Sequence, residues 1–315
     1  MFEQLYDSIT KFDTVIIHRH ASPDGDAIGS QTGLKYLIID NFPEKKVFTV
    51  GDAAGRYSFI EGSGTDCVPD AVFDGALSVI LDSAERGLVS DDRYLTAAYS
   101  VRVDHHIYCD TFTDSEIVDT SFESCAGMIA AFAMERGLVL SERSATALYT
   151  GMITDSGRFR YDSISPRTFE LASFLMKAGI NTEKLYRSLY CDTLENVKMR
   201  AFFAGKIRLF ENSPVAYTYT TADELASTGR DAFSVSRGMV GIMSDIKGVD
   251  IWVNFTESEG RVLCELRSSQ YNINPVAVKY GGGGHKKASG ADVKNYDEAI
   301  MMLNDLKKLT EQGNE

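Results

Sequence analysis

The stretch that decides the fold is Tyr99-Ser-Val-Arg-Val-Asp104-His105-His106-Ile-Tyr-Cys-Asp110. An apolar, β-branched run rises to Val103 and stops at an acid followed by two adjacent histidines, and the whole chain holds only five histidines. The run predicts the end of a buried strand. In open α/β sheets, functional groups gather just beyond the carboxyl ends of such strands. We therefore ask whether other strands of this chain end in similar chemistry.

Length and composition limit the class of protein. At 315 residues, 44% hydrophobic and 24% charged, the chain has the composition of a soluble globular protein and room for two domains. Its net charge of −13 argues against a protein that coats long duplex nucleic acid. The five cysteines lack paired spacing, the N-terminus lacks signal-peptide features, and no apolar run is long enough to span a bilayer. We expect a cytoplasmic protein with no membrane partner, and a monomer and a homodimer both remain open.

The N-terminal part alternates strand and helix patterns. Strands are predicted over 14–19, 46–50, 77–81, 99–104 and 116–118, and helices over 27–40 and from 141 towards 154. Thr120–Glu123 has the form of a capping box that opens a helix through about Arg136, and Ser165-Pro166 is typical of another helix start. The alternation predicts a parallel sheet with helices on both faces.

The C-terminal part has a different pattern of predicted strands and helices. Residues 181–210 read as helical and polar with no strand, which indicates a connector. Strands follow over 214–220, 249–256 and 261–267, a capping box at Thr221–Glu224, and helices over 274–280 and 297–310. We predict an α/β protein with a parallel-sheet catalytic domain over 1–185, a helical linker over 186–211 and a smaller α/β domain with a mixed sheet over 212–315. The substrate cleft is expected between the two domains.

Two loops after predicted strands carry acids. His20-Ala-Ser-Pro-Asp24-Gly-Asp26 offers an imidazole and two carboxylates, and the amides of Gly29 and Ser30 could face an anion at the start of the next helix. An acidic turn that only caps this helix explains the loop equally well. Asp82 ends the strand 77–81, and on its own it is also explained as a helix cap.

A fourth stretch joins an acid to two arginines: Asp155-Ser-Gly-Arg158-Phe-Arg160-Tyr161. The acid can be a ligand, the arginines can bind phosphate, and Phe159 or Tyr161 could stack on a base. A helix terminus with solvated arginines is the simpler alternative.

Taken together, the four stretches predict a metal site, because a parallel sheet would bring their acids and histidines to one edge. Carboxylate and imidazole ligands without thiolate suit Mn²⁺ or Mg²⁺, and less often Zn²⁺, Co²⁺ or Fe²⁺. The ligands exceed the needs of one ion, which favours two ions about 3.5–4 Å apart and an activated water. With no Ser or Cys in a nucleophile motif, the water is the expected attacker and phosphoester hydrolysis the expected reaction. His18 lies outside these stretches and is expected to be a strand residue without a catalytic role.

These four stretches resemble motifs I to IV of the DHH phosphoesterase superfamily, and Asp104-His105-His106 matches its name-giving triplet. Leu266-Arg267-Ser268 and Gly281-Gly-Gly-Gly-His285-Lys-Lys-Ala-Ser-Gly290 resemble the signature of the DHH-associated substrate domain. Ser156 and Ser289 depart from the commoner threonine and alanine, both conservatively. The resemblance covers nearly the whole chain in the right order.

The resemblance implies roles for individual residues. One ion would be held by His20 and Asp24, the other by Asp26, His105 and Asp155, and Asp82 would bridge them. His106 would face the scissile phosphate or its leaving oxygen, and Asp104 would orient a histidine, which gives a catalytic set of His106, Asp82 and Asp104.

The C-terminal signature predicts the substrate grip. A glycine run exposes amides to a phosphate, and residues 261–290 carry five basic side chains against one acid, a net charge of 5 − 1 = +4. A flexible glycine loop with solvated lysines is the alternative. The expected substrate contacts are Arg158, Arg160, Arg267, Ser268, Gly282, Gly283, Gly284 and His285.

By size and C-terminal domain, the chain resembles the compact bacterial oligoribonucleases that also dephosphorylate 3′-phosphoadenosine 5′-phosphate. That resemblance implies short oligoribonucleotides or a nucleotide bisphosphate as substrate. Two divalent cations are expected, Mn²⁺ first, with Mg²⁺ or Co²⁺ open. The alternatives are a soluble phosphodiesterase for linear or cyclic dinucleotides and a nucleotide-binding sensor without turnover.

Overall fold

The computed structural model describes residues 1–311, which form two compact units that divide between Cys191 and Asp192. The segment predicted as a linker, 186–211, holds the end of helix α6 (Thr182–Tyr190), helix α7 (Leu194–Ala204) and strand β6 (Arg208–Leu209). The expectation that 181–210 contains no strand is wrong, because β6 pairs with the following strand. The predicted domain boundaries and the cleft between the domains stay predictions.

The N-terminal unit is built on a five-stranded sheet in which all pairs are parallel, as predicted. Its order is β2-β1-β3-β4-β5. The strands are β1 (Thr14–His18), β2 (Lys46–Thr49), β3 (Leu77–Leu81), β4 (Tyr99–Asp104) and β5 (Ser115–Val118). Parallel strands need long connections, and these place the carboxyl ends of β1, β3 and β4 side by side.

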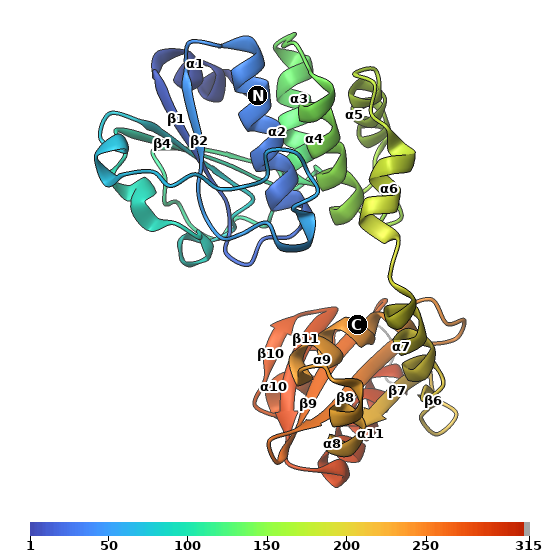
Figure 1. The fold of residues 1–315 in the computed structure, drawn as a ribbon. Coiled ribbons are helices and arrows are strands. Elements are labelled where there is room, and N and C mark those ends of the chain that lie inside the picture. The colour runs from blue at the N-terminus through green and yellow to red at the C-terminus, as the bar shows by residue number, and fades with distance from the viewer. Residues whose placement is uncertain (312–315) are drawn as a thin grey trace. The chain divides into compact units, whose positions relative to one another are not determined.

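Helices cover one face of this sheet (Figure 1). Alternate strand residues such as Val15, Val79 and Val103 share a core with helical residues such as Leu34 and Ile129. The helices are α1 (Glu3–Lys11), α2 (Gly25–Asn41), α3 (Cys125–Glu135), α4 (Glu142–Asp155), α5 (Pro166–Met176) and α6.

The other face of the sheet is covered differently from the prediction. Ile16 packs there against Val50, Val68 and Phe73, which come from the segments that follow β2. The connection from β2 to β3 holds the short 3₁₀ helices η1 (Gly55–Tyr57) and η2 (Asp70–Val72), and the connection from β3 to β4 holds η3 (Arg86–Leu88) and η4 (Asp92–Thr96). The expectation of helices on both faces is therefore wrong, because the connections on this side are too irregular to form α-helices.

Helix α3 also starts at a different residue from the predicted one. Its N-cap is Ser124, whose hydroxyl accepts a hydrogen bond from the amide of Gly127, so the capping box at Thr120–Glu123 is not used. The Glu123 carboxylate is buried and accepts hydrogen bonds from Ser124 and Thr168. The start of α3 matters because it lies beside the candidate site described below.

The C-terminal unit contains a mixed six-stranded sheet of order β10-β11-β9-β8-β7-β6. Only β7 and β8 pair in parallel. The strands besides β6 are β7 (Val215–Thr220), β8 (Ile251–Ser258), β9 (Arg261–Ser268), β10 (Gly283–His285) and β11 (Ala288–Val293). The helices are α7, α8 (Ala222–Thr228), α9 (Ala232–Val240), η5 (Gly241–Met243), α10 (Asn274–Lys279) and α11 (Tyr296–Glu311).

One face of this second sheet packs on α11. Val253, Leu266 and Val293 of the sheet bury themselves against Met302 and Leu306 of the helix. The capping box predicted at Thr221–Glu224 is present and opens α8. Among the described residues, 1–311, no helix in either unit is both long enough and apolar enough to cross a membrane.

Candidate metal centre

Three strand ends and two helix ends bring the predicted ligands together. His20 follows β1, Asp82 follows β3 and His105 follows β4. The Nε2 atom of His20 lies 3.5 Å from Asp82 Oδ2 and 3.8 Å from Asp24 Oδ1. The Nε2 atom of His105 lies 3.6 Å from Asp82 Oδ1, 3.5 Å from Asp155 Oδ2 and 3.8 Å from Asp26 Oδ2. Asp82 thus stands between a His20 group and a His105 group.

Asp82 is held in an unusual backbone conformation. Its φ is +51°, a left-handed value that is uncommon for residues other than glycine and costs energy. The residue still extends the sheet, since its amide donates to the carbonyl oxygen of Val103 at 3.1 Å. Its side chain is 2% exposed, and Oδ1 is buried with no hydrogen-bond partner among the described residues. The turn therefore aims the buried, unsatisfied Oδ1 at His105 and the other oxygen, Oδ2, at His20.

The two acids of the first loop have structural roles as well. Asp24 is the N-cap of α2, and its Oδ1 accepts hydrogen bonds from the amides of Asp26 and Ala27 at 2.9 and 3.0 Å. The Asp26 carboxylate accepts from the amides of Cys125 and Ala126 at 2.6 and 2.8 Å, at the N-terminus of α3. The positive end of that helix dipole partly balances the crowded acids.

The sequence suggested that Gly29 lies at the start of a helix, where its amide could face an anion. The structure shows that it does not lie there. Helix α2 begins at Gly25, so Gly29 lies inside the helix. A Cβ at Gly29 would lie 2.6 Å from the carbonyl oxygen of Ala147 in α4. Gly25 and Gly33 meet Thr154 and Leu148 of α4 equally closely. The glycines at every fourth position let α2 and α4 pack together, and this contact places the ends of both helices beside the sheet.

The charges at this site are out of balance without a cation. Burial, together with Asp82 and Asp155, raises the pKa of Asp26 well above its ordinary value. Burial also raises the pKa of Asp155 to about 6, with His105 opposing the shift. Burial alone would lower the pKa of His105, but Asp82 and Asp26 raise it to about 10. Acids that resist ionisation beside histidines that retain protons indicate a site shaped for positive charge.

The donor set fits divalent cations. Candidate ligand atoms of Asp26, His105 and Asp155 lie within 4.8 Å of one another, and the same holds for His20, Asp24 and Asp82. A third such group, Asp82, His105 and His106, overlaps the other two. The oxygen and imidazole donors, with the orphaned Asp82 Oδ1 among them, suit borderline and hard ions. The predicted assignment of each ligand to one ion or the other stays a prediction.

His106 is oriented by a chain of buried polar contacts. Its Nδ1 donates a hydrogen bond to Asp104 Oδ1 at 2.8 Å, while Asp104 Oδ2 accepts from Arg102 Nη2 at 2.6 Å. The contact with Asp104 raises the pKa of His106, although burial opposes the shift. The side chains of Asp104 and Arg102 are fully buried, whereas that of His106 is 47% exposed. The exposed imidazole is therefore anchored from within the sheet.

Arg102 is the residue of this chain that sequence reasoning missed. It also donates to the carbonyl oxygens of Ala84 and Asp110 and forms a salt bridge with Glu116. It thus ties the turn after Asp82 and the loop after His106 to Asp104. The signal was present, because a charged residue inside a β-branched, fully buried parallel strand requires a buried partner.

The two arginines after Asp155 belong to a strained turn. Gly157, Arg158 and Phe159 all have positive φ, at +57°, +63° and +60°. The Arg158 guanidinium lies over the ring of Tyr190, 4.0 Å from its centroid, and Arg160 Nε donates to the carbonyl oxygen of Gly157. Their role as phosphate ligands stays a prediction.

The aromatic side chains of this turn differ in accessibility. Phe159 is packed between Tyr149 and Phe169, with centroid distances of 5.9 and 5.7 Å. Tyr161 is 55% exposed. Of the two side chains considered for base stacking, Tyr161 is the more exposed, and Phe159 is partly buried.

The predicted substrate contacts of the C-terminal unit cluster around β9, β10 and β11. Arg267 Nη1 donates to Glu265 Oε2 and to the carbonyl oxygen of Leu266. Ser268 Oγ accepts from the amides of Gln270 and Tyr271, so this hydroxyl supports the turn after β9. Arg267 pairs in register with Ala288 of β11, the strand that follows the glycine run.

The glycine run forms a hairpin with β11. A Cβ at Gly282 would lie 2.0 Å from the carbonyl oxygen of Gly290, and Gly284 has a φ of +130°. Gly283 meets no such obstacle, and His285 is exposed at the edge of the sheet. Gly282 and Gly284 are thus required by close backbone approach. Substrate binding by Gly282, Gly283, Gly284 and His285 stays a prediction.

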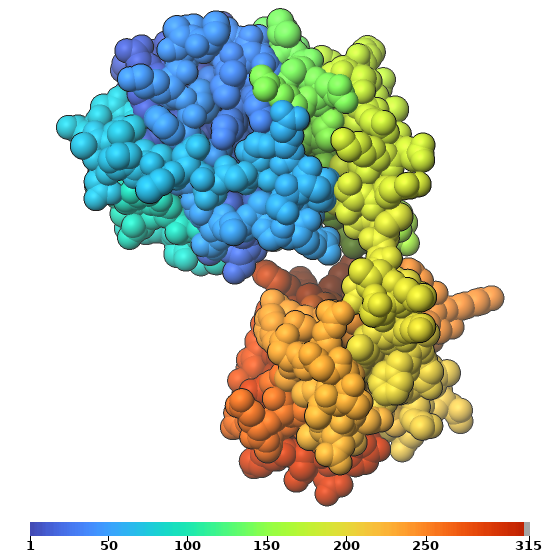
Figure 2. Space-filling model, viewed as in Figure 1, coloured from blue at the N-terminus to red at the C-terminus, as the bar shows by residue number. Residues whose placement is uncertain are grey.

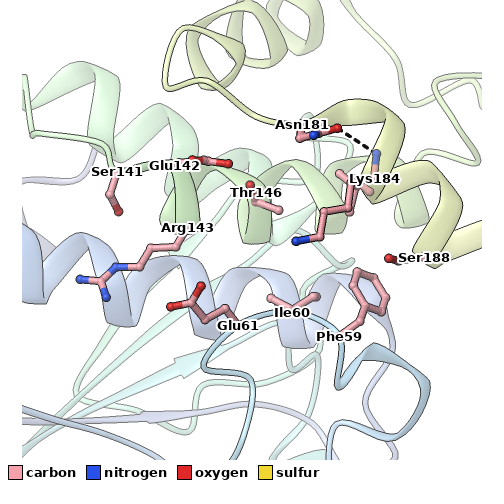
Figure 3. A pocket seen from close by; sticks show the side chains of 11 residues that line it. Phe59, Ile60, Glu61, Ser141, Glu142, Arg143, Thr146, Asn181, Lys184 and Ser188 are labelled. Carbon is pink, nitrogen blue, oxygen red and sulfur yellow. Dashed lines mark hydrogen bonds between the residues drawn. The ribbon is translucent and has the colours of Figure 1, made fainter.

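A separate cavity of about 400 Å³ lies away from the cluster of acids (Figure 3). It is bounded by the N-terminus of α4, by α6 and by the loop that carries Phe59 and Ile60. Lys184 extends from α6 across it toward this loop. Asp155 lies at the opposite end of α4, about 20 Å along the helix. The cavity therefore plays no part in the candidate centre.

Comparisons with known proteins show which protein family the chain resembles. A family model described as the DHH family, N-terminal domain, matches residues 14–152, and one described as the DHHA1 domain matches residues 218–312. The chain is 34% identical over 315 residues to a Bacillus subtilis protein named bifunctional oligoribonuclease and PAP phosphatase NrnA, and covers 99% of each chain. It is 32% identical to the Mycoplasma pneumoniae protein of the same name, covering 96% of this chain and 94% of that one.

A solved structure supports the fold. The crystal structure of an exopolyphosphatase-related protein from Bacteroides fragilis matches with a TM-score of 0.86 at 23% identity. The match covers 98% of this chain and 95% of that one.

Proposed function

Because the chain belongs to the DHH family and carries the DHHA1 domain along with it, we propose that it hydrolyses phosphoesters in small nucleic-acid substrates. The proposed substrates are short oligoribonucleotides, cleaved to mononucleotides, and 3′-phosphoadenosine 5′-phosphate, converted to AMP. Relatives that match over almost their full length bear the name bifunctional oligoribonuclease and PAP phosphatase, which supports this pair of substrates.

The observation that carries the proposal is the position of Asp82 between two groups of ligand atoms. Its two oxygens face His20 on one side and His105 on the other, at 3.5 and 3.6 Å. A shared carboxylate between two imidazole–carboxylate groups is the arrangement expected of a two-ion phosphoesterase. We propose Asp82 as the bridging ligand, with His20 and Asp24 on one side and Asp26, His105 and Asp155 on the other.

Two divalent cations held at this centre, Mn²⁺ being the ion we expect, would supply positive charge for the phosphate oxygens and lower the pKa of water. The protein's own contribution is preorganisation. The strained turn at Asp82 and the α3 amides on Asp26 fix these carboxylates before any substrate arrives. Groups that are already oriented need no reorganisation during the reaction.

His106 is proposed to contact the scissile phosphate or its leaving oxygen. Its Nδ1 is engaged by Asp104, so the other ring nitrogen, Nε2, remains for the substrate. Asp104 holds the tautomer and the ring orientation, as carboxylates do for functional histidines. Arg102 in turn holds Asp104, which makes it a positioning residue rather than a catalytic one.

The DHHA1 domain is proposed to grip the substrate. Arg267 offers a guanidinium, and the β10 hairpin offers glycine amides and the exposed His285. Guanidinium groups and glycine amides are common binders of terminal phosphates. On the N-terminal unit, Arg158 and Arg160 lie three and five residues after Asp155 and are proposed to bind the backbone of the substrate.

The test is a comparison of initial rates for ribonucleotides of two to five residues, 3′-phosphoadenosine 5′-phosphate and cyclic dinucleotides, with Mn²⁺ and with chelator. We expect metal-dependent hydrolysis of the first two classes. Preference for cyclic dinucleotides would support the phosphodiesterase alternative instead, which the names of the full-length relatives do not favour. Binding without turnover would indicate the sensor alternative.

A further inference from the structure

Helix α9 and the glycine run enclose a cavity of about 300 Å³ in the C-terminal unit, a volume at the lower end of the range of ligand pockets. The helix lies against β8 and β9, and the cavity is lined by residues of α9, β9, β11 and the start of the glycine run. In Figure 2 the segment from α8 to α9, coloured gold, lies at the surface of this unit. All the lining residues belong to one compact unit.

One wall of the cavity carries an aromatic ring. Phe233 of α9 lines the cavity and is 61% exposed. The guanidinium of Arg237, one helical turn further on, lies over this ring at 5.0 Å from its centroid. A cation held over an aromatic ring is attracted by its π face, so Arg237 stabilises the ring at the surface. Exposed aromatic rings are the usual stacking partners of nucleobases, because every base has a π face.

Another wall of the cavity consists of backbone. Gly281 and Gly282 begin the glycine run, and Gly290 lies in β11. Gly281 has a φ of +77°, and Gly282 approaches the carbonyl of Gly290 too closely for a Cβ. Residues without side chains let a ligand approach the peptide groups directly. A backbone wall beside an aromatic ring suits a flat ligand.

Ser236 gives the cavity an unsatisfied polar group. The residue lines the cavity, its side chain is 1% exposed, and its Oγ has no hydrogen-bond partner among residues 1–311. A buried hydroxyl without a partner is unfavourable and calls for an explanation. The edge of a nucleobase carries hydrogen-bond donors and acceptors. A base therefore offers both a face for Phe233 and a polar edge for Ser236.

Glu265 connects this cavity to the predicted phosphate grip. Its Oε1 lies 3.5 Å from Arg237 Nε, and its Oε2 accepts a hydrogen bond from Arg267 Nη1 at 3.1 Å. Glu265 and Arg267 are two residues apart in β9, so their side chains lie on the same face of the sheet, about 7 Å apart along the strand. A nucleotide joins its phosphate to its base through a single sugar, so a ligand whose phosphate meets Arg267 has its base near the cavity.

We propose that this cavity binds one nucleobase of the substrate, with Phe233 as the stacking surface and Ser236 as a hydrogen-bond partner. The inference rests on the proposed function, since it takes the substrate to be a nucleotide or a short oligonucleotide. It adds a source of specificity to that function. Contacts with phosphate hold any phosphorylated compound, whereas this cavity distinguishes a nucleotide that carries a base from one that does not.

Binding without turnover tests the cavity separately from hydrolysis. With chelator present, isothermal titration calorimetry on the full-length protein gives the affinity for 5′-phosphorylated diadenylate and for the two analogues that lack one of its bases. We expect one analogue to bind about tenfold or more weakly, as the loss of a stacked base predicts. Phe233→Ala should weaken the binding of diadenylate by a similar factor. It should have little effect on the analogue whose missing base is the one that the cavity binds.

Phe202→Ala is the matched control for the loss of the ring. Phe202 is another exposed phenylalanine of the C-terminal unit, and the Lys206 ammonium lies over its ring at 5.5 Å. It belongs to α7 and is not among the residues that line the cavity. We expect this variant to bind all three ligands as the wild-type protein does.

Ser236→Ala tests the polar contact. The substitution removes a hydroxyl that has no partner in the protein, so the melting temperature should stay the same or rise. The affinity for diadenylate should nevertheless fall by about threefold or more, because the base loses a hydrogen bond. Thr256→Val is the control, since it removes another buried, unpartnered hydroxyl that does not line the cavity. It should leave the affinity unchanged.

The outcomes separate this proposal from the proposed function. Equal affinity of the wild-type protein for the three ligands, or no binding of any of them, would overturn the base site. So would a Phe233→Ala variant that retains the wild-type affinity for diadenylate, even if the protein hydrolyses diadenylate with Mn²⁺. Conversely, base binding that depends on Phe233, in a protein that hydrolyses no nucleotide with Mn²⁺, would support the base site and contradict the proposed function.

Discussion

Arg102 Nη2 donates a hydrogen bond to Asp104 Oδ2 at 2.6 Å, and neither side chain has any exposed surface. The other oxygen of Asp104 accepts from His106 at 2.8 Å. Although burial alone would raise the pKa of Asp104, His106 and Arg102 hold it below its ordinary value. The buried arginine therefore keeps Asp104 ionised in a place where an isolated carboxylate would be unfavourable, and the ionised carboxylate keeps His106 in place.

Replacing Arg102 by methionine should be costly in two ways. It leaves the Asp104 and Glu116 carboxylates without their cation, which we expect to lower the free energy of unfolding by about 3 kcal/mol. It also loosens His106, so kcat should fall roughly tenfold or more with little change in KM. Arg102→Lys keeps the charge and should recover part of both losses. Urea denaturation and steady-state kinetics on 3′-phosphoadenosine 5′-phosphate measure the two effects.

Arg261→Met is the matched control for that experiment. Arg261 is 68% exposed and its contact with Asp292 is 3.6 Å, so its loss should change stability by less than about 0.5 kcal/mol. If Arg102→Met lost stability but retained the wild-type kcat, the positioning role of Arg102 would be wrong.

Asp82→Asn should remove metal-dependent hydrolysis by at least about a hundredfold, because it neutralises the carboxylate shared by both ligand groups. The binding of Mn²⁺ can be followed without turnover. A cation that binds only the folded chain raises the melting temperature of the wild-type protein, and the rise should be much smaller in the variant. Asp74→Asn, at an exposed loop position, should behave as wild type in both assays. Near-normal turnover by Asp82→Asn would contradict the bridging role.

Arg267→Ala should weaken substrate binding and leave the chemical step intact. We expect KM to rise about tenfold while kcat stays within about twofold of wild type. Arg261→Ala on the same strand is the control, since both residues belong to β9 but Arg261 is outside the predicted substrate contacts. An unchanged KM in Arg267→Ala would mean that its guanidinium serves only Glu265 and the Leu266 carbonyl.

Much of this fold could be predicted from local patterns. The five strands of the first sheet are short β-branched runs, and the order of acids after them was enough to bring His20, Asp82 and His105 to one edge. To predict that these side chains converge, one needs only the rule that the carboxyl ends of parallel strands lie at the same edge of the sheet. The caps at Ser141 and Thr221 were visible for the same reason, because the interaction they make is local in the sequence.

The features that sequence reasoning missed depend on contacts between distant segments. Asp26 accepts hydrogen bonds from the amides of Cys125 and Ala126, which lie about a hundred residues further on. The start of α3 at Ser124 rather than Thr120 depends on that packing and on the buried Glu123 beneath it. The loops that cover the second face of the sheet have no periodic pattern, so nothing in the sequence distinguishes them from short helices.

The spacing Gly25-x₃-Gly29-x₃-Gly33 is visible in the sequence, but Gly29 was interpreted as part of an anion site at the start of a helix. The structure assigns it to the close approach of α2 and α4. Gly29→Ala should force the two backbones apart and lower the stability of the N-terminal unit by about 1–3 kcal/mol. Gly238→Ala is the matched control, since Gly238 lies inside α9 with open space where a Cβ would go. An added methyl there should stabilise the C-terminal unit by about 0.5–1 kcal/mol.

The two effects can be separated in one full-length protein. Trp252 is the only tryptophan of the chain and lies in β8, so its fluorescence follows the C-terminal unit, whereas far-ultraviolet circular dichroism follows both units. In urea, Gly29→Ala should move part of the dichroism transition to lower concentration and leave the fluorescence transition in place. Gly238→Ala should move the fluorescence transition to higher concentration. If Gly29→Ala proved as harmless as Gly238→Ala, the helix contact would tolerate a side chain, and the glycine spacing would need another explanation.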